Sequence, residues 1–403
     1  MNTMKITFTN HRPMRIAAVD AMRALTMFLM LFVNDIPGVK NIPHWLGHAE
    51  MNEDMMGFSD LIFPAFLFCM GMSIPFAIQN RYRKGESTIQ VISHLFWRSL
   101  ALIVMGLFTL NSGGVKDGIS HQWFTLLMVA GFFLVWAVYP QAGGYRKRLF
   151  TVMKSVGVLL LASLIIYKDM HGVPFKTGWW GILGLIGWTY AVCATVYLFS
   201  RESLKKNLIV WMVMILITVV SQTTWIPQDY FSRVIFLPFI PGGWTHHTLG
   251  MSGIVCSLLM QRAVSSGQYK PFFMTLAGLG ICMFAFGWLA HPHWIISKIL
   301  ATPTWLFYCL ALFFPLFGFI YWLTDIKQIR KWYAPIAPAG SATLTCYIIP
   351  YIYYAVIQLL HIHYPSVLCE GIPGLLRSWV FSFLIVWITG WIVKGGIMLN
   401  HSE

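Results

Sequence analysis

Long apolar runs recur along the whole chain and are separated by short polar connections. A membrane-spanning helix needs about 20 mostly apolar residues, and their centres lie near residues 27, 70, 103, 130, 158, 188, 215, 255, 280, 313, 347 and 386. Backbone in hydrocarbon must satisfy its own hydrogen bonds, so each run is predicted to be a helix. The pattern predicts an all-α, polytopic integral membrane helix bundle with about 12 (10–12) transmembrane helices, organised as a single domain over residues 1–403.

Composition supports this pattern and changes what the charge of the chain means. The sequence is 57% hydrophobic and only 10% charged, whereas a soluble domain has about 25% charged residues. In a membrane protein, a net charge of +14 indicates topology and contact with anionic lipid rather than with nucleic acid. Most Lys and Arg residues of the connections fall on the same side as the N-terminus. This predicts cytoplasmic N- and C-termini and an external loop around His48.

The most polar stretch beside a span is 43–64, PHWLGHAEMNEDMMGFSDLIFP. It holds His48, three acids between residues 50 and 54, and Asp60 at the start of the next apolar run. A solvated loop is the simpler interpretation, because loops are ordinarily polar. However, an ionisable group within a span is costly and usually functional, and an imidazole titrates near neutral pH. His48 and Asp60 are therefore candidate site residues.

Asn34 and Asp35 end the first expected span on the side where Asp60 begins the second. Helices joined by a short loop are usually neighbours in space. We therefore expect these three side chains and His48 to converge at one external mouth, unless Asn34 and Asp35 only cap their helix.

Two arginines lie towards the cytoplasmic ends of expected spans. Asp20 and Arg23 are three residues apart, so they can pair on one helical face, either as a simple ion pair or as part of an anion site. Arg98 either extends its charge to the membrane surface or binds a phosphate with its planar guanidinium.

Histidine pairs occur at His246–His247, His291–His293 and His361–His363, all at expected external span ends. A metal site needs several ligands in a defined geometry, and no cysteine or carboxylate cluster accompanies these pairs. The seven cysteines are scattered, without metal-like spacing. We expect no metal site.

The order of these residues resembles that of a known family. The opening RIAAVDAMRALTMFLMLFVND is followed by GHAEMNEDMMGFSDLIFPAFLFCMGMSIP and then by WRSL. Together they resemble the heparan-α-glucosaminide N-acetyltransferase family of transmembrane acyltransferases, and most closely its bacterial, DUF5009-type branch. The best-matched core is 15–110, followed much later by a similar segment at 298–305. The matching positions are Asp20, Arg23, Val33, Asn34, His48, Ala49, Asp60 to Pro64, and Arg98.

The resemblance implies a membrane-bound acetyltransferase that takes acetyl-CoA from the cytoplasm as co-substrate. Its acceptor would be the amine of a glucosamine-type sugar or glycan on the extracytoplasmic side. His48 would be the general base or the acetyl carrier, Asp60 or Asn34 would orient its ring, and Arg98 and Arg23 would bind the phosphates of the donor.

The resemblance also implies a multi-pass protein of the bacterial inner (plasma) membrane, in contact with lipid, with a homodimer left open. Two other functions remain as alternatives: an O-acetyltransferase of an envelope polysaccharide, and a twelve-span sugar transporter. Many transporters contain internal repeats, and no convincing repeat is visible in this sequence.

Overall fold

The computed structural model describes residues 16–116, 118–140, 143–223, 244–396 and 398–399. Each helix centre expected from the sequence falls within a helix of this structure. The helices are α1 Ala17–Asp35, α2 Ser59–Arg83, α3 Thr88–Leu110, α4 His121–Trp136, α5 Gly144–Met170, α6 Gly181–Ser200, α7 Leu204–Val220, α9 Thr245–Ser266, α10 Tyr269–Ala290, α11 Pro303–Tyr321, α12 Ala337–Ser341, α13 Thr343–Leu359 and α14 Gly371–Lys394.

Short helical turns complete the described structure: η1 Ile36–Gly38, η2 His44–Leu46, η4 Trp322–Ile326, η5 Lys331–Ile336 and η6 Ser366–Cys369. Among the described helices, 8 are long and apolar enough to cross a membrane, or 9 if the pair Lys331–Ser341 and Thr343–Leu359, bent by 78°, forms one span. The all-α polytopic bundle is thereby confirmed. The number twelve stays a prediction, since α4 has only 16 residues and α7 has 17.

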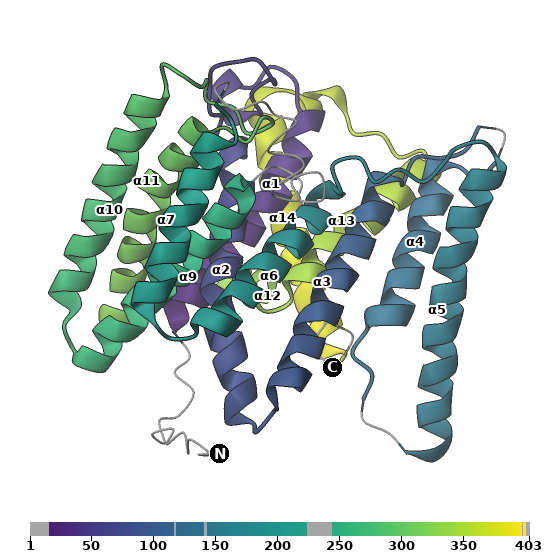
Figure 1. The fold of residues 1–403 in the computed structure, drawn as a ribbon. Coiled ribbons are helices and arrows are strands. Elements are labelled where there is room, and N and C mark those ends of the chain that lie inside the picture. Colours follow the sequence, from purple (N-terminus) through teal and green to yellow (C-terminus); the bar gives the residue numbers. More distant parts are fainter. Residues whose placement is uncertain (1–15, 117, 141–142, 224–243, 397, 400–403) are drawn as a thin grey trace.

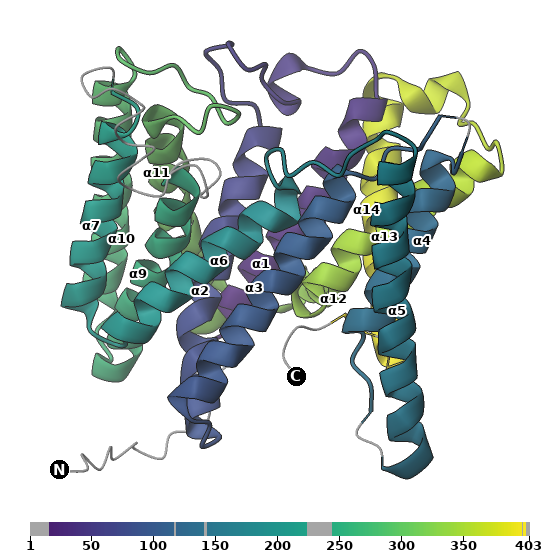
Figure 2. The same cartoon turned by 45° about the vertical axis from the view of Figure 1, so that its right-hand side comes forward.

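Helix α1 lies in the middle of the bundle and is buried along most of its length. It contacts helices from both ends of the sequence, namely α2, α11, α12, α13 and α14. By contrast, α4 and α5 stand together at one side (Figures 1 and 2), and most apolar side chains of α5 are exposed. An exposed apolar helix of this kind is typical of a lipid-facing position.

The connections alternate between two ends of the bundle. Loop 36–58, loop 171–180, loop 291–302 and loop 360–370 lie together at the end that we call the His48 end (Figure 1). Helix α1 begins and α14 finishes at the opposite end, where α2 also turns into α3. Successive connections therefore lie at alternating ends of the bundle, as was assumed when the Lys and Arg residues of the connections were assigned to two sides.

Glycines allow the central helices to approach closely. A Cβ atom on Gly71 of α2 would lie 1.8 Å from the carbonyl oxygen of Gly250 in α9, and one on Gly106 of α3 would lie 2.2 Å from the backbone nitrogen of Gly184 in α6. Small residues at such crossings are the usual means of helix association in membranes. Substituting either glycine would force two helices apart.

Asp325, in η4 beyond the end of α11, holds the start of α1. Its carboxylate accepts hydrogen bonds from the backbone N–H groups of Ala17 (3.1 Å) and Ala18 (2.7 Å). A carboxylate at a helix N-terminus satisfies free N–H groups and complements the helix dipole. The position of α1 is thus fixed by a contact with a residue more than 300 positions later in the chain.

Candidate active site

Loop 36–58 folds back over the start of α2. The N–H of Phe58 donates to the carbonyl of Trp45 (2.7 Å), and the hydroxyl of Ser59 donates to the carbonyl of Leu46 (2.7 Å). Gly57 passes so close to the loop that an added Cβ would lie 2.1 Å from a backbone oxygen of Gly47. These contacts bring His48 next to the first turn of α2.

The carboxylate of Asp60 is the centre of a buried polar cluster at this point. It is 1% exposed, and its Oδ1 lies 2.8 Å from Nδ1 of His48. Its Oδ2 accepts the backbone N–H groups of Ala49 (3.0 Å) and Gly57 (3.1 Å). A carboxylate only accepts, so in the tautomer with the proton on Nδ1 the imidazole donates to Asp60 and Nε2 keeps a free lone pair.

Lys298 is the third member of this cluster, and the sequence analysis assigned it no role. Its Nζ lies 3.1 Å from Oδ1 of Asp60 and 2.9 Å from Nδ1 of His48. Burial lowers the pKa of Lys298, and the adjacent Asp60 carboxylate opposes this effect. The one available signal was the resemblance of segment 298–305, which begins at this lysine.

Loop 291–302, which carries Lys298, is bound directly to loop 36–58. Asp54 accepts the backbone N–H of Ile296 (2.8 Å) and contacts Nε2 of His291 (2.8 Å), while the hydroxyl of Ser297 donates to the carbonyl of Met51 (2.9 Å). Burial by itself would raise the pKa of Asp54, but the hydrogen bonds from Ile296 and His291 lower it. The fold therefore fixes where Lys298 meets His48.

Asn34 and Asp35 take different directions from the end of α1. Asn34 is exposed and lines, with His48, a cavity of about 300 Å³ that is also bordered by Tyr351 and Tyr354 of α13. No hydrogen bond between Asn34 and His48 is present among the described residues. The expected convergence thus includes Asn34, His48 and Asp60.

Asp35 does not take part in that convergence. Its carboxylate accepts hydrogen bonds from Tyr354, from Arg377 (3.0 Å) and from Ser378 (2.6 Å). Arg377 and Ser378 belong to α14, so Asp35 ties the end of α1 to the last helix instead of to the cluster. The expectation that Asp35 joins His48 was wrong, because a buried ion pair from α14 holds it elsewhere.

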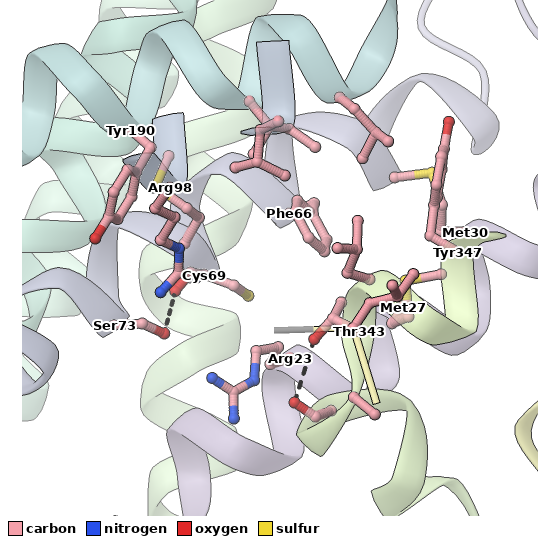
Figure 3. Close-up of a pocket in the computed structure, with 18 of the residues that line it drawn as sticks. Arg23, Met27, Met30, Phe66, Cys69, Ser73, Arg98, Tyr190, Thr343 and Tyr347 are labelled. Atoms are coloured by element: carbon pink, nitrogen blue, oxygen red, sulfur yellow. Dashed lines mark hydrogen bonds between the residues drawn. The ribbon is translucent and has the colours of Figure 1, made fainter. Parts of the chain in front are cut away.

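Arg23 and Arg98 line a second cavity, of about 270 Å³, deeper in the bundle. Arg23 forms the expected ion pair with Asp20 (2.9 Å), and the guanidinium of Arg98 lies over the ring of Tyr190, 4.7 Å from its centre. Arg98 forms no ion pair with a described residue, and its buried Nε has no hydrogen-bond partner. Figure 3 shows both guanidinium groups on one side of this cavity and Tyr347 on the other.

The cavities adjoin one another along the bundle. Ile182 and Tyr347 line both the Arg98 cavity and the His48 cavity. In the other direction, Arg98 and Tyr190 also border a third cavity of about 300 Å³, which is open to Lys84 and other polar residues at the end opposite His48. A row of cavities therefore runs from basic residues at one end of the protein to His48 at the other.

The histidine pair that opens α9 does not line these cavities. His246 and His247 lie in the first turn of α9, the span end expected from the sequence, and both side chains are buried. The described residues contain no group of three or more His, Cys, Asp or Glu side chains arranged to hold a metal ion.

The fold and these sites define a multi-pass membrane protein with an ionisable cluster at one end and a neighbouring, mostly apolar cavity that two arginines line. Residues 15–245, more than half of the chain, match the family described as a domain of unknown function, DUF5009. The chain belongs to this family, and the branch expected from its motifs is confirmed.

Two curated proteins are similar over a shorter region. Human heparan-alpha-glucosaminide N-acetyltransferase is 34% identical over 100 residues, which are 25% of this chain and 14% of the human protein. The mouse protein of the same name is 34% identical over 98 residues, 24% of this chain and 14% of the relative. The matched region thus covers about one seventh of the length of either relative.

Proposed function

We propose that the protein is a membrane acetyltransferase that moves the acetyl group of acetyl-CoA to the amine of a glucosamine-type sugar. The main support is the row of neighbouring cavities, in which two arginines line one cavity and His48, the partner of Asp60, lines the next. The similarity to two N-acetyltransferases supports the same reaction class. His48, Asp60 and Asn34 would be the catalytic residues, and Arg98 and Arg23 would bind the donor.

The donor would enter from the end opposite His48. Coenzyme A is a polyanion, and the planar guanidinium of Arg98, which has no acidic partner among the described residues, suits a phosphate. The mostly apolar cavity beyond it, bordered by Met27, Met30 and Phe66, suits the pantetheine arm. The acetyl group would then reach the cavity shared by Asn34 and His48.

The transfer step uses the free lone pair of His48. The acceptor amine attacks the thioester carbonyl carbon, a C–N bond forms, and Nε2 takes one N–H proton from the nitrogen. The C–S bond breaks, and the departing thiolate receives that proton from the imidazolium, which yields an amide and free CoA. Asp60 keeps Nδ1 protonated and the ring oriented, while the amide of Asn34 would donate to the carbonyl oxygen as charge develops there.

A second route has the same residues but a covalent intermediate. Nε2 would attack the thioester itself, and the acetyl-imidazole would then pass its acetyl group to the amine. In both routes the donor comes from the cytoplasm and the acceptor lies on the extracytoplasmic side, in a protein of the bacterial plasma membrane with cytoplasmic termini. Lipid surrounds the bundle, and a homodimer is compatible with either route.

The test uses purified protein in detergent with acetyl-labelled acetyl-CoA and glucosamine. We expect transfer by wild type and none by His48→Ala, whereas His44→Ala, which removes an exposed histidine of the same loop, retains activity. Label that stays on wild-type protein without acceptor supports the covalent route. Transfer to N-acetylglucosamine would instead indicate an O-acetyltransferase, and no transfer and no acetyl-CoA binding by wild type would reject the proposal in favour of a transporter.

A further inference from the structure

Lys298, His48 and Asp60 form a closed triangle of contacts. The lysine Nζ lies 2.9 Å from Nδ1 of His48 and 3.1 Å from Oδ1 of Asp60, and the same Oδ1 lies 2.8 Å from Nδ1. The carboxylate is almost fully buried, whereas the side chain of His48 is 38% exposed. One buried anion therefore has two possible cationic partners, the ammonium and an imidazolium.

The number of charges decides which partner carries the proton. A buried carboxylate next to an imidazole alone would favour the imidazolium, because the opposite charge is close and poorly screened. A second cation 2.9 Å from Nδ1 offsets that attraction and repels a further proton on the ring. With the ammonium present, the cluster is already neutral and the imidazole can stay uncharged.

We propose that Lys298 is a positioning residue that supplies the counter-charge of Asp60 and thereby keeps His48 a neutral base, with Nδ1–H towards Asp60 and Nε2 open to the cavity. This role rests on the proposed function only in so far as His48 acts as a base. Without the ammonium, His48 would itself carry the counter-charge up to a higher pH, and below that pH it would have no lone pair for the acceptor amine.

The position of Lys298 is set by the fold and not by chance placement of a long side chain. Its neighbour Ser297 is buried, bonded to Met51 of loop 36–58 and, through its backbone N–H, to the hydroxyl of Thr302 (3.1 Å). The side chain of Lys298 is itself only 23% exposed. Loop 291–302 therefore delivers a charge to a fixed point beside the ring.

Other titratable groups among the described residues face the cluster, and none of these is a second cation. They are Cys309 of α11, Glu53 of the same loop, and Tyr347, Tyr351 and Tyr354 of α13, which border the His48 cavity. All of these are neutral or anionic near neutral pH. They do not replace the ammonium, so its removal changes the charge that the ring experiences.

The test measures the protonation of His48 without relying on activity. Diethyl pyrocarbonate reacts with the neutral imidazole, and peptide mass spectrometry reports the extent at each histidine as a function of pH. We compare wild type, Lys298→Met and Lys298→Arg, with His44 as an internal reference because it is exposed, lies in the same loop and is paired with Glu53. Acetyl transfer is followed over the same pH range.

We expect the pH at which His48 is half as reactive as at its plateau, called its midpoint here, to rise by about one pH unit or more in Lys298→Met. In Lys298→Arg this midpoint should stay near the wild-type value. The pH at which acetyl transfer falls off on the acidic side should rise by the same amount in Lys298→Met, and the transfer rate should recover at high pH. An unchanged His48 midpoint in Lys298→Met, with the His44 midpoint also unchanged, would overturn the proposal. If the methionine variant does not fold, Lys298→Gln removes the same charge and is read in the same way.

The chemical readout separates two failures. If wild type transfers no acetyl group but the His48 midpoint moves as expected, the proposed function fails and the role of Lys298 stands. If transfer occurs and the midpoint does not move, the role of Lys298 fails alone.

Discussion

The two ends of the cavity row differ in how their charged groups are satisfied. At the His48 end, Asp60 has four hydrogen-bonding contacts from the protein, and loop 291–302 closes over the cluster. Deeper in the bundle, Arg98 has an aromatic ring beneath it but no acidic partner among the described residues. Under the proposed function, the group that would move protons is preorganised by its own chain, whereas the group that would bind the anionic donor is left for the ligand to complete.

A substitution in the hydrogen-bonded Asp60 cluster at the His48 end should have the largest effect. Asp60→Asn removes the charge that pairs with Lys298 and turns an acceptor towards Nδ1 into an amide. We expect transfer to fall by about 100-fold or more, and stability to fall by about 3 kcal/mol because a buried partner is left uncompensated. Initial rates and thermal unfolding in detergent measure the two effects. Near-wild-type rates at normal stability would remove Asp60 from the mechanism.

A substitution of Arg98, which has no acidic partner among the described residues, should affect only the binding of acetyl-CoA. Arg98→Gln is expected to raise the KM for acetyl-CoA by about tenfold or more, since a charge-assisted hydrogen bond is lost, with kcat nearly unchanged. Arg83→Gln is the matched control, because Arg83 is exposed at the end of α2. Initial rates at varied acetyl-CoA decide the matter, and an equal rise in both variants would place the donor elsewhere.

A smaller effect should follow when the closing loop is loosened. Asp54→Ala removes the contacts with Ile296 and His291 but leaves the triangle of charges intact. We expect kcat to fall a few-fold, since Lys298 is held less firmly, and hydrogen exchange of residues 296–302 to become faster. Exchange as slow as in wild type would mean that Ser297 and Met51 suffice to dock the loop.

The smallest effect concerns the exposed pair His44–Glu53. Hydrogen bonding to Glu53 raises the pKa of His44, and the same contact lowers the pKa of Glu53. Protonated His44 stabilises the loop fully below pH 6.5, its ordinary pKa, and this stabilisation is lost as the pH rises through its raised pKa. The Glu53 carboxylate stabilises the loop fully above pH 4.5, its ordinary pKa, and this stabilisation is lost as the pH falls through its lowered pKa.

The pair should therefore support the loop most strongly between those limits. Hydrogen exchange of residues 47–57 in wild type, corrected for intrinsic rates, should be slowest between about pH 4.5 and 6.5 and should lose that pH dependence in His44→Ala. A pH dependence that persists in the variant would assign the effect to another group.

The bundle could be predicted from the sequence because apolar runs of sufficient length leave few alternatives to helices. Local spacing also predicted the pair of Asp20 and Arg23, and the short connection between the first two spans predicted that His48 and Asp60 meet. Lys298 was not assigned a role, because it is 250 residues from His48 and reaches it only after two loops dock. Asp35 was misplaced for the same reason, since its partners Arg377 and Ser378 arrive with the last helix.

Helix α1 carries Arg23 near one end and Asn34 near the other, and it is anchored at its start by Asp325. Eleven residues of α-helix separate these two side chains along the axis by about 16 Å. Under the proposed function, this rigid helix would set the distance between the arginine that binds the donor phosphates and the residues at which the acyl group reacts. Donors with a shorter arm would then bind without reacting, and the length of α1 would select among thioesters.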